Sequence, residues 1–222
     1  MNLALFDLDH TLIPMDSDHG WGQFTVQIGW RDAHAFAQAN HLYYEQYKAG
    51  TLDIADYIRF ATGAIREQGL EKSIAAHAQY MSDVVQKNIK KQALDLVQRH
   101  RDAGDRIVIV TATNEFVTRP IAEAFGADEL IAIELERDAT GLPTGEIKGT
   151  PSFREGKVAR VEQWLTEHGT NWDGVGRSTF YSDSINDLPL LEKVSHPVAT
   201  NPDDRLRAIA EQRGWPILNL FS

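Results

Sequence analysis

Two aspartates lie directly after a short apolar run near the start of the chain. The run Leu3–Phe6 ends in Asp7, and Asp9 follows two positions later. A short apolar run without helical periodicity predicts a strand buried on both faces of a parallel sheet. Ligands bind at the carboxyl edge of such sheets, and two carboxylates there need a cation or a proton to compensate their charge. A helix N-cap or an Asx turn would explain one aspartate and not both.

Three more polar sites are expected at the same edge. Thr111 follows the apolar residues 107–110, Lys157 lies at the start of a helix predicted over 153–168, and Asp183 follows a strand predicted over 178–182. Each has a structural explanation when taken alone: a strand end, a solvated helix residue and an N-cap. Their joint occurrence, each just past a strand or at a helix start, favours one catalytic site.

The chemistry that fits these residues is phosphoryl transfer through a covalent intermediate. Asp7 would attack phosphorus and form an acyl phosphate, which water then hydrolyses. Asp9 would protonate the leaving alkoxide and later accept a proton from the attacking water. A bend after Asp7 would let Asp7, the carbonyl of Asp9 and Asp183 hold Mg²⁺, with waters completing the octahedron.

The remaining residues would bind the phosphoryl group. Lys157 supplies a second positive charge beside the ion. The hydroxyl of Thr111 and the backbone N–H groups of Ala112 and Thr113 can donate to phosphoryl oxygens. The positive field in the cleft would then come from the ion and the lysine, although the chain as a whole is acidic.

Composition sets limits on other functions. The 222 residues carry a formal charge of −10 and no cysteine, with 42% hydrophobic and 24% charged residues. These values are ordinary for a soluble globular protein. The acidic balance argues against nucleic-acid binding and against docking on an anionic membrane. No signal peptide and no membrane-spanning run are visible in the sequence, so a cytoplasmic enzyme is expected.

Two kinds of pattern divide the chain. Residues 15–90 read as helical, with helices expected over 31–47 and from 53 onward, and a long helix over 71–101. After residue 104 strands and helices alternate, with a turn-rich hairpin expected at 140–145. Alternation predicts an α/β fold with a doubly wound parallel sheet. We therefore expect a core of residues 1–14 and 91–222 with an inserted α-helical cap at 15–90.

The order of these motifs resembles that of the haloacid dehalogenase superfamily, in its phosphoserine phosphatase-like branch. Residues 7–12, DLDHTL, look like the family's D-x-D-x-T signature, and Thr111 and Lys157 match its second and third motifs. Residues 183–187, DSIND, are similar to its D-x-x-x-D motif. The resemblance covers nearly the whole chain and implies a Rossmann-like core with a helical cap.

Roles follow from the resemblance residue by residue. It implies that Asp7 is the nucleophile, Asp9 the acid and base, Asp183 a Mg²⁺ ligand and Asp187 an organiser of the metal site, with Asn186 near the substrate. An acid at position 9 favours a phosphatase or phosphotransferase over a dehalogenase, because an alkoxide leaving group needs a proton.

The substrate is expected to be a small phosphorylated metabolite, and the resemblance points to an amine. Asp16 stands where phosphoserine phosphatases carry an acid for the substrate amine, and Arg59 where they carry an arginine for its carboxylate. A helix cap and a surface ion pair explain the same two residues. Three departures from the phosphoserine phosphatase pattern favour a larger amine-bearing substrate such as histidinol phosphate. They are Asp16 in place of Glu, Ala112–Thr113 in place of Gly-Gly, and the aromatic cap. A phosphotransferase of the same fold and a non-catalytic Mg²⁺- and phosphate-binding module are the alternatives.

Overall fold

The core of the protein is a parallel six-stranded sheet. The computed structural model describes residues 1–221, and the strand order is β3-β2-β1-β6-β7-β8. All neighbouring strands in this sheet run parallel. The chain leaves the central strand β1 toward β2 on one side and later returns to β6 on the other. The sheet therefore reverses its winding direction beside β1, where open α/β folds bind ligands.

The strands and helices have the following bounds. The large sheet consists of β1 (Leu3–Phe6), β2 (Arg106–Asn114), β3 (Glu129–Ile133), β6 (Ser178–Ser182), β7 (His196–Thr200) and β8 (Ile217–Leu218). A separate antiparallel hairpin consists of β4 (Leu135–Arg137) and β5 (Pro143–Ile147). The helices are α1 (Ser17–Gln27), α2 (Ala33–Ala49), α3 (Ile54–Ala61), α4 (Gly63–Gln68), α5 (Leu70–Tyr80), α6 (Gln86–Asn88), α7 (Lys91–Asp102), α8 (Glu115–Ala124), α9 (Glu155–Glu167), α10 (Leu188–Lys193) and α11 (Asp204–Arg213). The short helical turns are η1 (Met81–Val85), η2 (Trp172–Gly174) and η3 (Ile185–Asp187).

Helices cover both faces of the sheet, so β1 is buried on both sides. Ala4 and Phe6 pack in one hydrophobic cluster with residues of α7 and α8. Leu3 and Leu5 pack in a second cluster with residues of α9, α10 and α11. Alternate side chains of a strand point to opposite faces, so a strand between two helical layers must be apolar at every position. The predicted doubly wound sheet and the buried first strand are confirmed.

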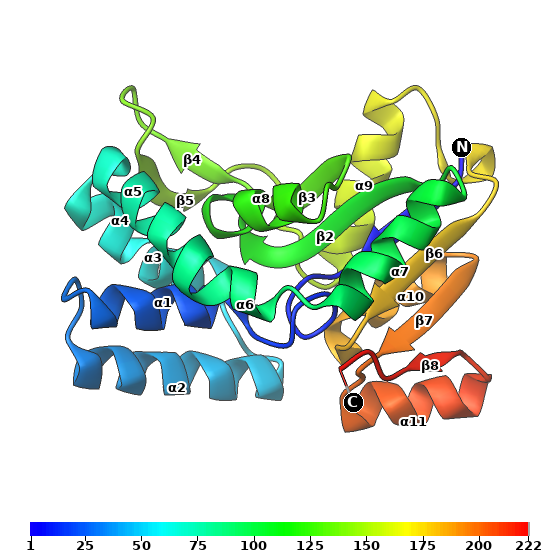
Figure 1. Cartoon of the computed structure of the whole chain (residues 1–222), viewed down its shortest axis with the longest axis horizontal. Coiled ribbons are helices and arrows are strands. Elements are labelled where there is room, and N and C mark those ends of the chain that lie inside the picture. Colours follow the sequence, from blue (N-terminus) through cyan, green and yellow to red (C-terminus); the bar gives the residue numbers. More distant parts are fainter. Residues whose placement is uncertain (222) are drawn as a thin grey trace.

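The helical insert, residues 15–90, enters between β1 and β2, and its helices gather at one end of the molecule (Figure 1). The insert shares the hydrophobic cluster of the core, because Trp21 of α1 and Tyr80 of α5 belong to the cluster that contains Phe6. The hairpin β4–β5, from the other half of the chain, packs against α3 and α4. The insert is thus held against the core from two directions.

The single long helix predicted over 71–101 is wrong. The chain forms α5, the π-helical turn η1 and α6, and it then becomes extended at Ile89 before α7 begins at Lys91. A straight helix over that stretch would be roughly 46 Å long at 1.5 Å per residue. The break lets α5 pack on α1 while α7 packs on β2. The helical character of both segments is confirmed, but the segment between them, residues 81–90, contains no Gly or Pro that would mark the break.

The helices predicted over 31–47 and from 53 onward correspond to α2 and α3, and their observed ends are set by local caps. Asp53 accepts hydrogen bonds from the N–H groups of Ala55 and Asp56 and caps α3. Gly50 ends α2 in the left-handed conformation, with φ of 77°. Short polar caps and a glycine with positive φ satisfy the backbone groups that a helix end leaves unpaired.

The helices of residues 1–221 include none that is both long and apolar enough to cross a membrane.

Gly156, in the first turn of α9, allows the chain to fold tightly just before Lys157. A Cβ at this position would lie 2.0 Å from the carbonyl oxygen of Pro151, so backbone would have to move. We expect Gly156→Ala to destabilise the protein by about 1–3 kcal/mol, as overpacking generally does. Chemical denaturation measures the change. Gly63→Ala is the matched control, because its Cβ would meet only the Arg31 guanidinium at an ordinary 3.5 Å. Equal stability of the two variants would contradict the packing argument.

Candidate active site

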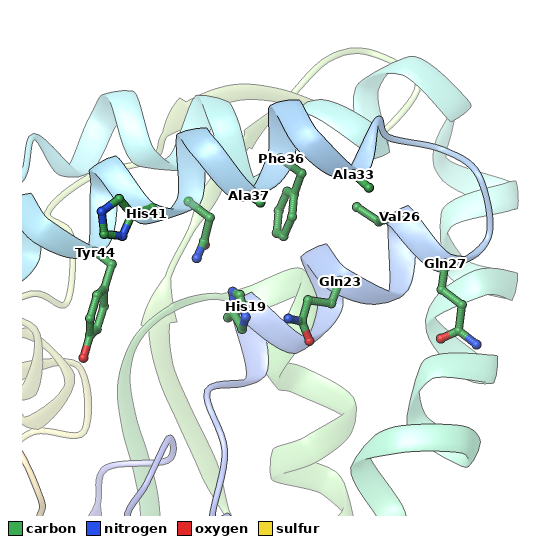
Figure 2. A pocket seen from close by; sticks show the side chains of 10 residues that line it. His19, Gln23, Val26, Gln27, Ala33, Phe36, Ala37, His41 and Tyr44 are labelled. Atoms are coloured by element: carbon green, nitrogen blue, oxygen red, sulfur yellow. The ribbon is translucent and has the colours of Figure 1, made fainter.

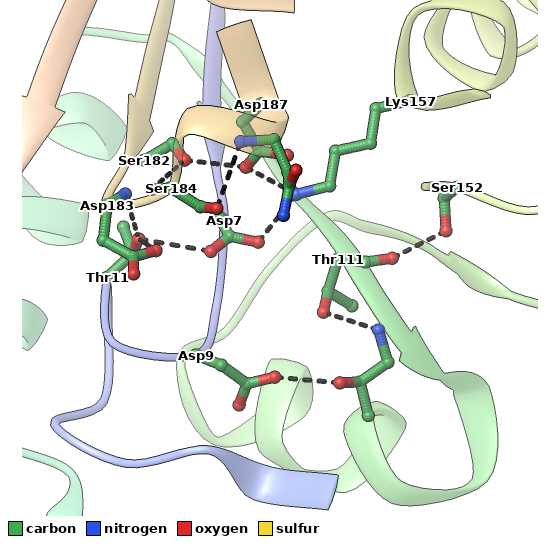
Figure 3. A network of polar contacts seen from close by, with 12 residues as sticks. Asp7, Asp9, Thr11, Thr111, Ser152, Lys157, Ser182, Asp183, Ser184 and Asp187 are labelled. Atoms are coloured by element: carbon green, nitrogen blue, oxygen red, sulfur yellow. Dashed lines mark hydrogen bonds and ion pairs between the residues drawn. The ribbon is translucent and has the colours of Figure 1, made fainter. Parts of the chain in front are cut away.

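A buried ion-pair network lies at the carboxyl ends of β1 and β6. The ammonium of Lys157 donates to Asp7 Oδ1 at 2.8 Å and to Asp187 Oδ2 at 2.7 Å (Figure 3). The Lys157 side chain is only 2% exposed. Burial lowers the pKa of this lysine, but the charges of Asp187 and Asp7 outweigh burial and raise the pKa above its ordinary value. Lys157 is therefore a permanent cation that orients both carboxylates.

Asp187 is held from a second side by the hydroxyl of Ser182, which donates to Oδ2 at 2.7 Å. Burial raises the pKa of Asp187 to about 6, and the nearby Lys157 opposes that rise. Asp187 Oδ2 thus accepts hydrogen bonds from both Ser182 and Lys157.

Asp183 carries the negative charge that protein side chains leave uncompensated. The hydroxyl of Thr11 lies between Asp183 and Asp7, 3.1 Å from Asp183 Oδ1 and 3.2 Å from Asp7 Oδ2. The ion pairs formed by residues 1–221 do not include Asp183. Burial and the charges of Asp7 and Asp187 raise the pKa of Asp183 well above its usual range. Of these three neighbouring carboxylates, Lys157 contacts only Asp7 and Asp187, so the site has less positive than negative charge.

The donor set at this point fits a hard cation with few protein ligands. In the part of the chain that the structure describes, no three Asp, Glu, His or Cys side chains converge as a metal site. Asp7 and Asp183, whose carboxylates the Thr11 hydroxyl joins, follow adjacent strands, and the chain turns directly after Asp9, where His10 has a φ of 58°. Mg²⁺ is bound by one or two carboxylates and keeps several waters, so two side chains are sufficient.

Asp9 lies in a different environment from Asp7, because no cationic side chain of residues 1–221 forms an ion pair with its carboxyl group. Asp9 Oδ1 accepts from the backbone N–H of Ser17 at 2.7 Å, and Oδ2 accepts from the hydroxyl of Thr113 at 2.9 Å. Burial, followed by the charge of Asp16, raises the pKa of Asp9 to about 8. At neutral pH this carboxyl group holds a proton that it can donate.

The phosphate-binding residues predicted around Thr111 lie inside a strand rather than after it. β2 continues to Asn114, and its pairing with β3 becomes irregular after Val110. The Thr111 carbonyl accepts from the Ser152 hydroxyl at 2.6 Å, which links β2 to the segment before α9. The N–H of Thr113 donates to the Thr111 hydroxyl at 3.1 Å, so this N–H is occupied in the present conformation.

A cavity of about 800 Å³ opens between the core and the insert. Ten of the eleven predicted site residues line it: Asp7, Asp9, Asp16, Thr111, Ala112, Thr113, Lys157, Asp183, Asn186 and Asp187. Asn186 Nδ2 is buried without a hydrogen-bond partner among residues 1–221. Tyr47, from α2, reaches across to the Ser184 hydroxyl at 3.1 Å and closes one side of the cavity.

Arg59 is the predicted substrate residue that does not line this cavity. Its guanidinium pairs with Asp56 at 2.6 Å and with Glu146 of the hairpin at 2.8 Å. The surface ion pair, which the sequence offered as the alternative, is what the structure shows. Asp16 lines the cavity, and it also caps α1 by accepting from the N–H of His19.

The structure adds an acid that the sequence did not single out. Asp18 lies in the first turn of α1, is 6% exposed, and lines the same cavity. Its pattern in the sequence was that of an ordinary acid near a helix N-terminus. Thr11 was likewise seen only as part of a motif, although its hydroxyl joins Asp7 and Asp183.

A second hollow of about 480 Å³ lies between α1 and α2 (Figure 2). Phe36 of α2 lies over α1 there, where a Cβ on Gly22 would meet its ring at 2.4 Å. His19, Asn40 and Tyr44 line both this hollow and the main cavity, so the two adjoin.

Comparisons with known proteins agree with this geometry. The family model of the haloacid dehalogenase-like hydrolases matches residues 4–192, and the chain belongs to that family. A histidinol-phosphatase of Neisseria meningitidis serogroup C is 42% identical over 218 residues, which is 98% of each chain. Phosphoserine phosphatase SerB1 of Mycobacterium tuberculosis is 30% identical over 217 residues, covering 96% of this chain and 69% of the relative. The protein is a phosphatase of this family.

Solved structures show the same fold. A Bordetella pertussis Tohama I protein of unknown function has a TM-score of 0.94 and 46% identity, and the match covers 99% of both chains. A substrate-bound phosphoserine phosphatase has a TM-score of 0.68 at 16% identity, covering 98% of this chain and 92% of that one. The recognition of the superfamily from its motifs is confirmed.

The environment of Asp18 predicts a pH-dependent stability. Burial raises the pKa of Asp18 to about 6, whereas an aspartate in the unfolded chain has an ordinary pKa near 3.8. The folded protein therefore binds more protons than the unfolded chain between these values, and stability falls as pH rises through them. Relative to Asp18→Asn, the wild-type protein should lose about 2 kcal/mol of unfolding free energy between pH 4 and pH 7. Urea denaturation across that range tests this, and parallel profiles for the two proteins would contradict it.

Proposed function

We propose that the protein is a Mg²⁺-dependent phosphomonoesterase that acts through an aspartyl phosphate on Asp7. The observation that carries this proposal is the contrast between two carboxyl groups of one cavity. Asp7 contacts the Lys157 ammonium at 2.8 Å, whereas Asp9 has no cation and its pKa is raised to about 8 by burial. Two acids with opposed environments are suited to opposite tasks, one as nucleophile and one as proton donor.

In the first step the Asp7 carboxylate attacks phosphorus. A bond forms between an Asp7 carboxylate oxygen and phosphorus, and the bond from phosphorus to the ester oxygen breaks. Asp9 gives its proton to that ester oxygen, so the product leaves as a neutral alcohol. The hydrogen bonds from Ser17 N–H and Thr113 Oγ1 keep the Asp9 carboxyl group in place for this transfer.

In the second step water attacks the same phosphorus. Asp9, now a carboxylate, accepts the water proton, and the bond between phosphorus and Asp7 breaks. Inorganic phosphate leaves, and both aspartates return to their starting protonation. One residue thus serves as acid and then as base.

Positive charge at phosphorus is needed in both steps. Mg²⁺, held by Asp7, Asp183 and the Asp9 carbonyl, would stabilise the charge on the phosphoryl oxygens. Lys157 adds a fixed cation, and Asp187 and Ser182 hold it in position. Thr111, Ala112, Thr113 and Asn186 are proposed to donate to the phosphoryl group or the substrate.

The proposed substrate is a small phosphomonoester that carries an amine, and histidinol phosphate is the favoured compound. The relative from Neisseria meningitidis with 42% identity is a histidinol-phosphatase. The cavity of about 800 Å³ accommodates such a molecule, and Asp16, Tyr43, Tyr44 and Tyr57 line the side formed by the insert. We infer that residues 15–90 form the cap that selects the substrate, and that the reaction takes place in the cytoplasm.

Replacing the nucleophile tests the proposal. Asp7→Asn keeps the shape of the side chain but removes the attacking charge, so turnover of p-nitrophenyl phosphate should fall by at least about 1,000-fold. Asp32→Asn is the matched control, because Asp32 caps α2 away from the cavity and Asn is an equally good cap. Steady-state kinetics measure the rates, and circular dichroism checks that both variants fold.

Retention of activity by a folded Asp7→Asn variant would overturn the proposed mechanism.

Removal of divalent ions by a chelator should abolish wild-type turnover, and added Mg²⁺ should restore it.

A further inference from the structure

Asp18 is held in the cavity wall by neutral donors from two other elements. The Tyr57 hydroxyl of α3 donates to Asp18 Oδ2 at 2.6 Å, and Asn114 Nδ2, at the end of β2, donates to Oδ1 at 3.2 Å. Asn114 is itself fixed, because its side chain caps α8 by accepting from the N–H of Val117. The carboxylate therefore has a defined position between the insert and the core.

No cation contacts this carboxylate among the residues that the structure describes. Arg31 influences it through space, but the Arg31 guanidinium donates to the carbonyls of Phe60 at 2.7 Å and Ala61 at 3.1 Å. Burial and the charge of Asp16 raise the pKa of Asp18, so the ionised form destabilises the folded protein at neutral pH. Folding stability alone does not explain a charged group at this place, and an incoming cation would relieve its cost.

The surroundings of Asp18 suit an organic cation. Tyr43, Tyr44, Tyr47 and Tyr57 line the same cavity, and aromatic faces attract cationic nitrogen. Tyr57 connects the carboxylate to the aromatic residues. Its hydroxyl donates to Asp18, and its ring packs against that of Tyr43 with centroids 5.4 Å apart.

The insert contributes no arginine to the cavity lining, and the arginine that does line the cavity, Arg205, comes from α11 of the core. Arg59 is bound by Asp56 and Glu146, Arg31 by backbone carbonyls, and neither lines the cavity. Lys48 lies at the rim and pairs with Glu45 at 2.6 Å. Of the two residues predicted to bind an amino-acid substrate, the acid Asp16 lines this wall and Arg59 does not.

We propose that Asp18, positioned by Tyr57 and Asn114, receives the cationic nitrogen of the substrate and is the residue that selects organic cations without a carboxylate. The inference rests on the proposed phosphatase function and names its substrate class. Asp16, which is exposed and caps α1, is then secondary in selection.

The test compares two phosphomonoesters of similar size, histidinol phosphate and 3-phenylpropyl phosphate, which has no cationic nitrogen. The wild-type protein should have a kcat/KM for histidinol phosphate about 10-fold to 100-fold higher, which corresponds to one charge-assisted hydrogen bond. Asp18→Asn should remove most of this preference and leave turnover of 3-phenylpropyl phosphate within about 3-fold. Asp32→Asn should keep the full preference. Phosphoserine should be a poorer substrate than histidinol phosphate for the wild-type protein.

A structural role for Asp18 would lower both substrates equally, so an unchanged ratio in a folded Asp18→Asn variant would overturn the inference. If that variant does not fold, inhibition of the wild-type protein decides: histidinol should inhibit at least about 10-fold more strongly than 3-phenylpropan-1-ol, and equal inhibition would overturn the inference. Absence of any wild-type turnover of p-nitrophenyl phosphate would instead count against the proposed function itself.

Discussion

The structure depends on how the negative charges of a few buried carboxylates are balanced at one edge of a parallel sheet. Lys157 is shared by Asp7 and Asp187, and its side chain is almost completely buried. Removing either partner from such a network leaves an isolated charge in a poorly solvated place, which is costly. One ammonium does not balance three carboxylates, however, and Asp183 remains without a counter-ion. The incomplete compensation is what suits the edge for a divalent ion and a phosphoryl group, because both supply the missing interactions.

The core side of the cavity and the side formed by the insert carry different chemical groups. The core side combines Lys157 with the carboxylates of strand ends, and it is suited to hold phosphorus. The side formed by the insert combines Asp16 and Asp18 with four tyrosines, and it has no arginine. A substrate with a phosphate at one end and a cationic nitrogen at the other would satisfy both sides at once. Asn114 and Tyr47 connect the two sides, through Asp18 and Ser184 respectively, so cap and core form one continuous wall.

Much of this arrangement could be predicted from the sequence, because β1 and β6 are apolar runs that end in acids. Their neighbours in the sheet follow from the right-handed alternation of strands and helices. The sequence could not show that Arg59 would pair with Glu146, since the hairpin that carries Glu146 comes 87 residues later and returns to the insert. Nor could it distinguish Asp18 from any acid in a first helical turn. The missed features all depend on tertiary contacts between distant segments.

The central claim is that a carboxylate oxygen of Asp7 becomes bonded to phosphorus. The most direct measurement is rapid acid quenching of the protein during turnover of ³²P-labelled substrate, followed by peptide mapping and mass spectrometry. The account predicts label on the peptide that contains Asp7, in an acyl phosphate that hydroxylamine cleaves. Label on another residue, or turnover with no labelled protein under conditions that trap acyl phosphates, would contradict it.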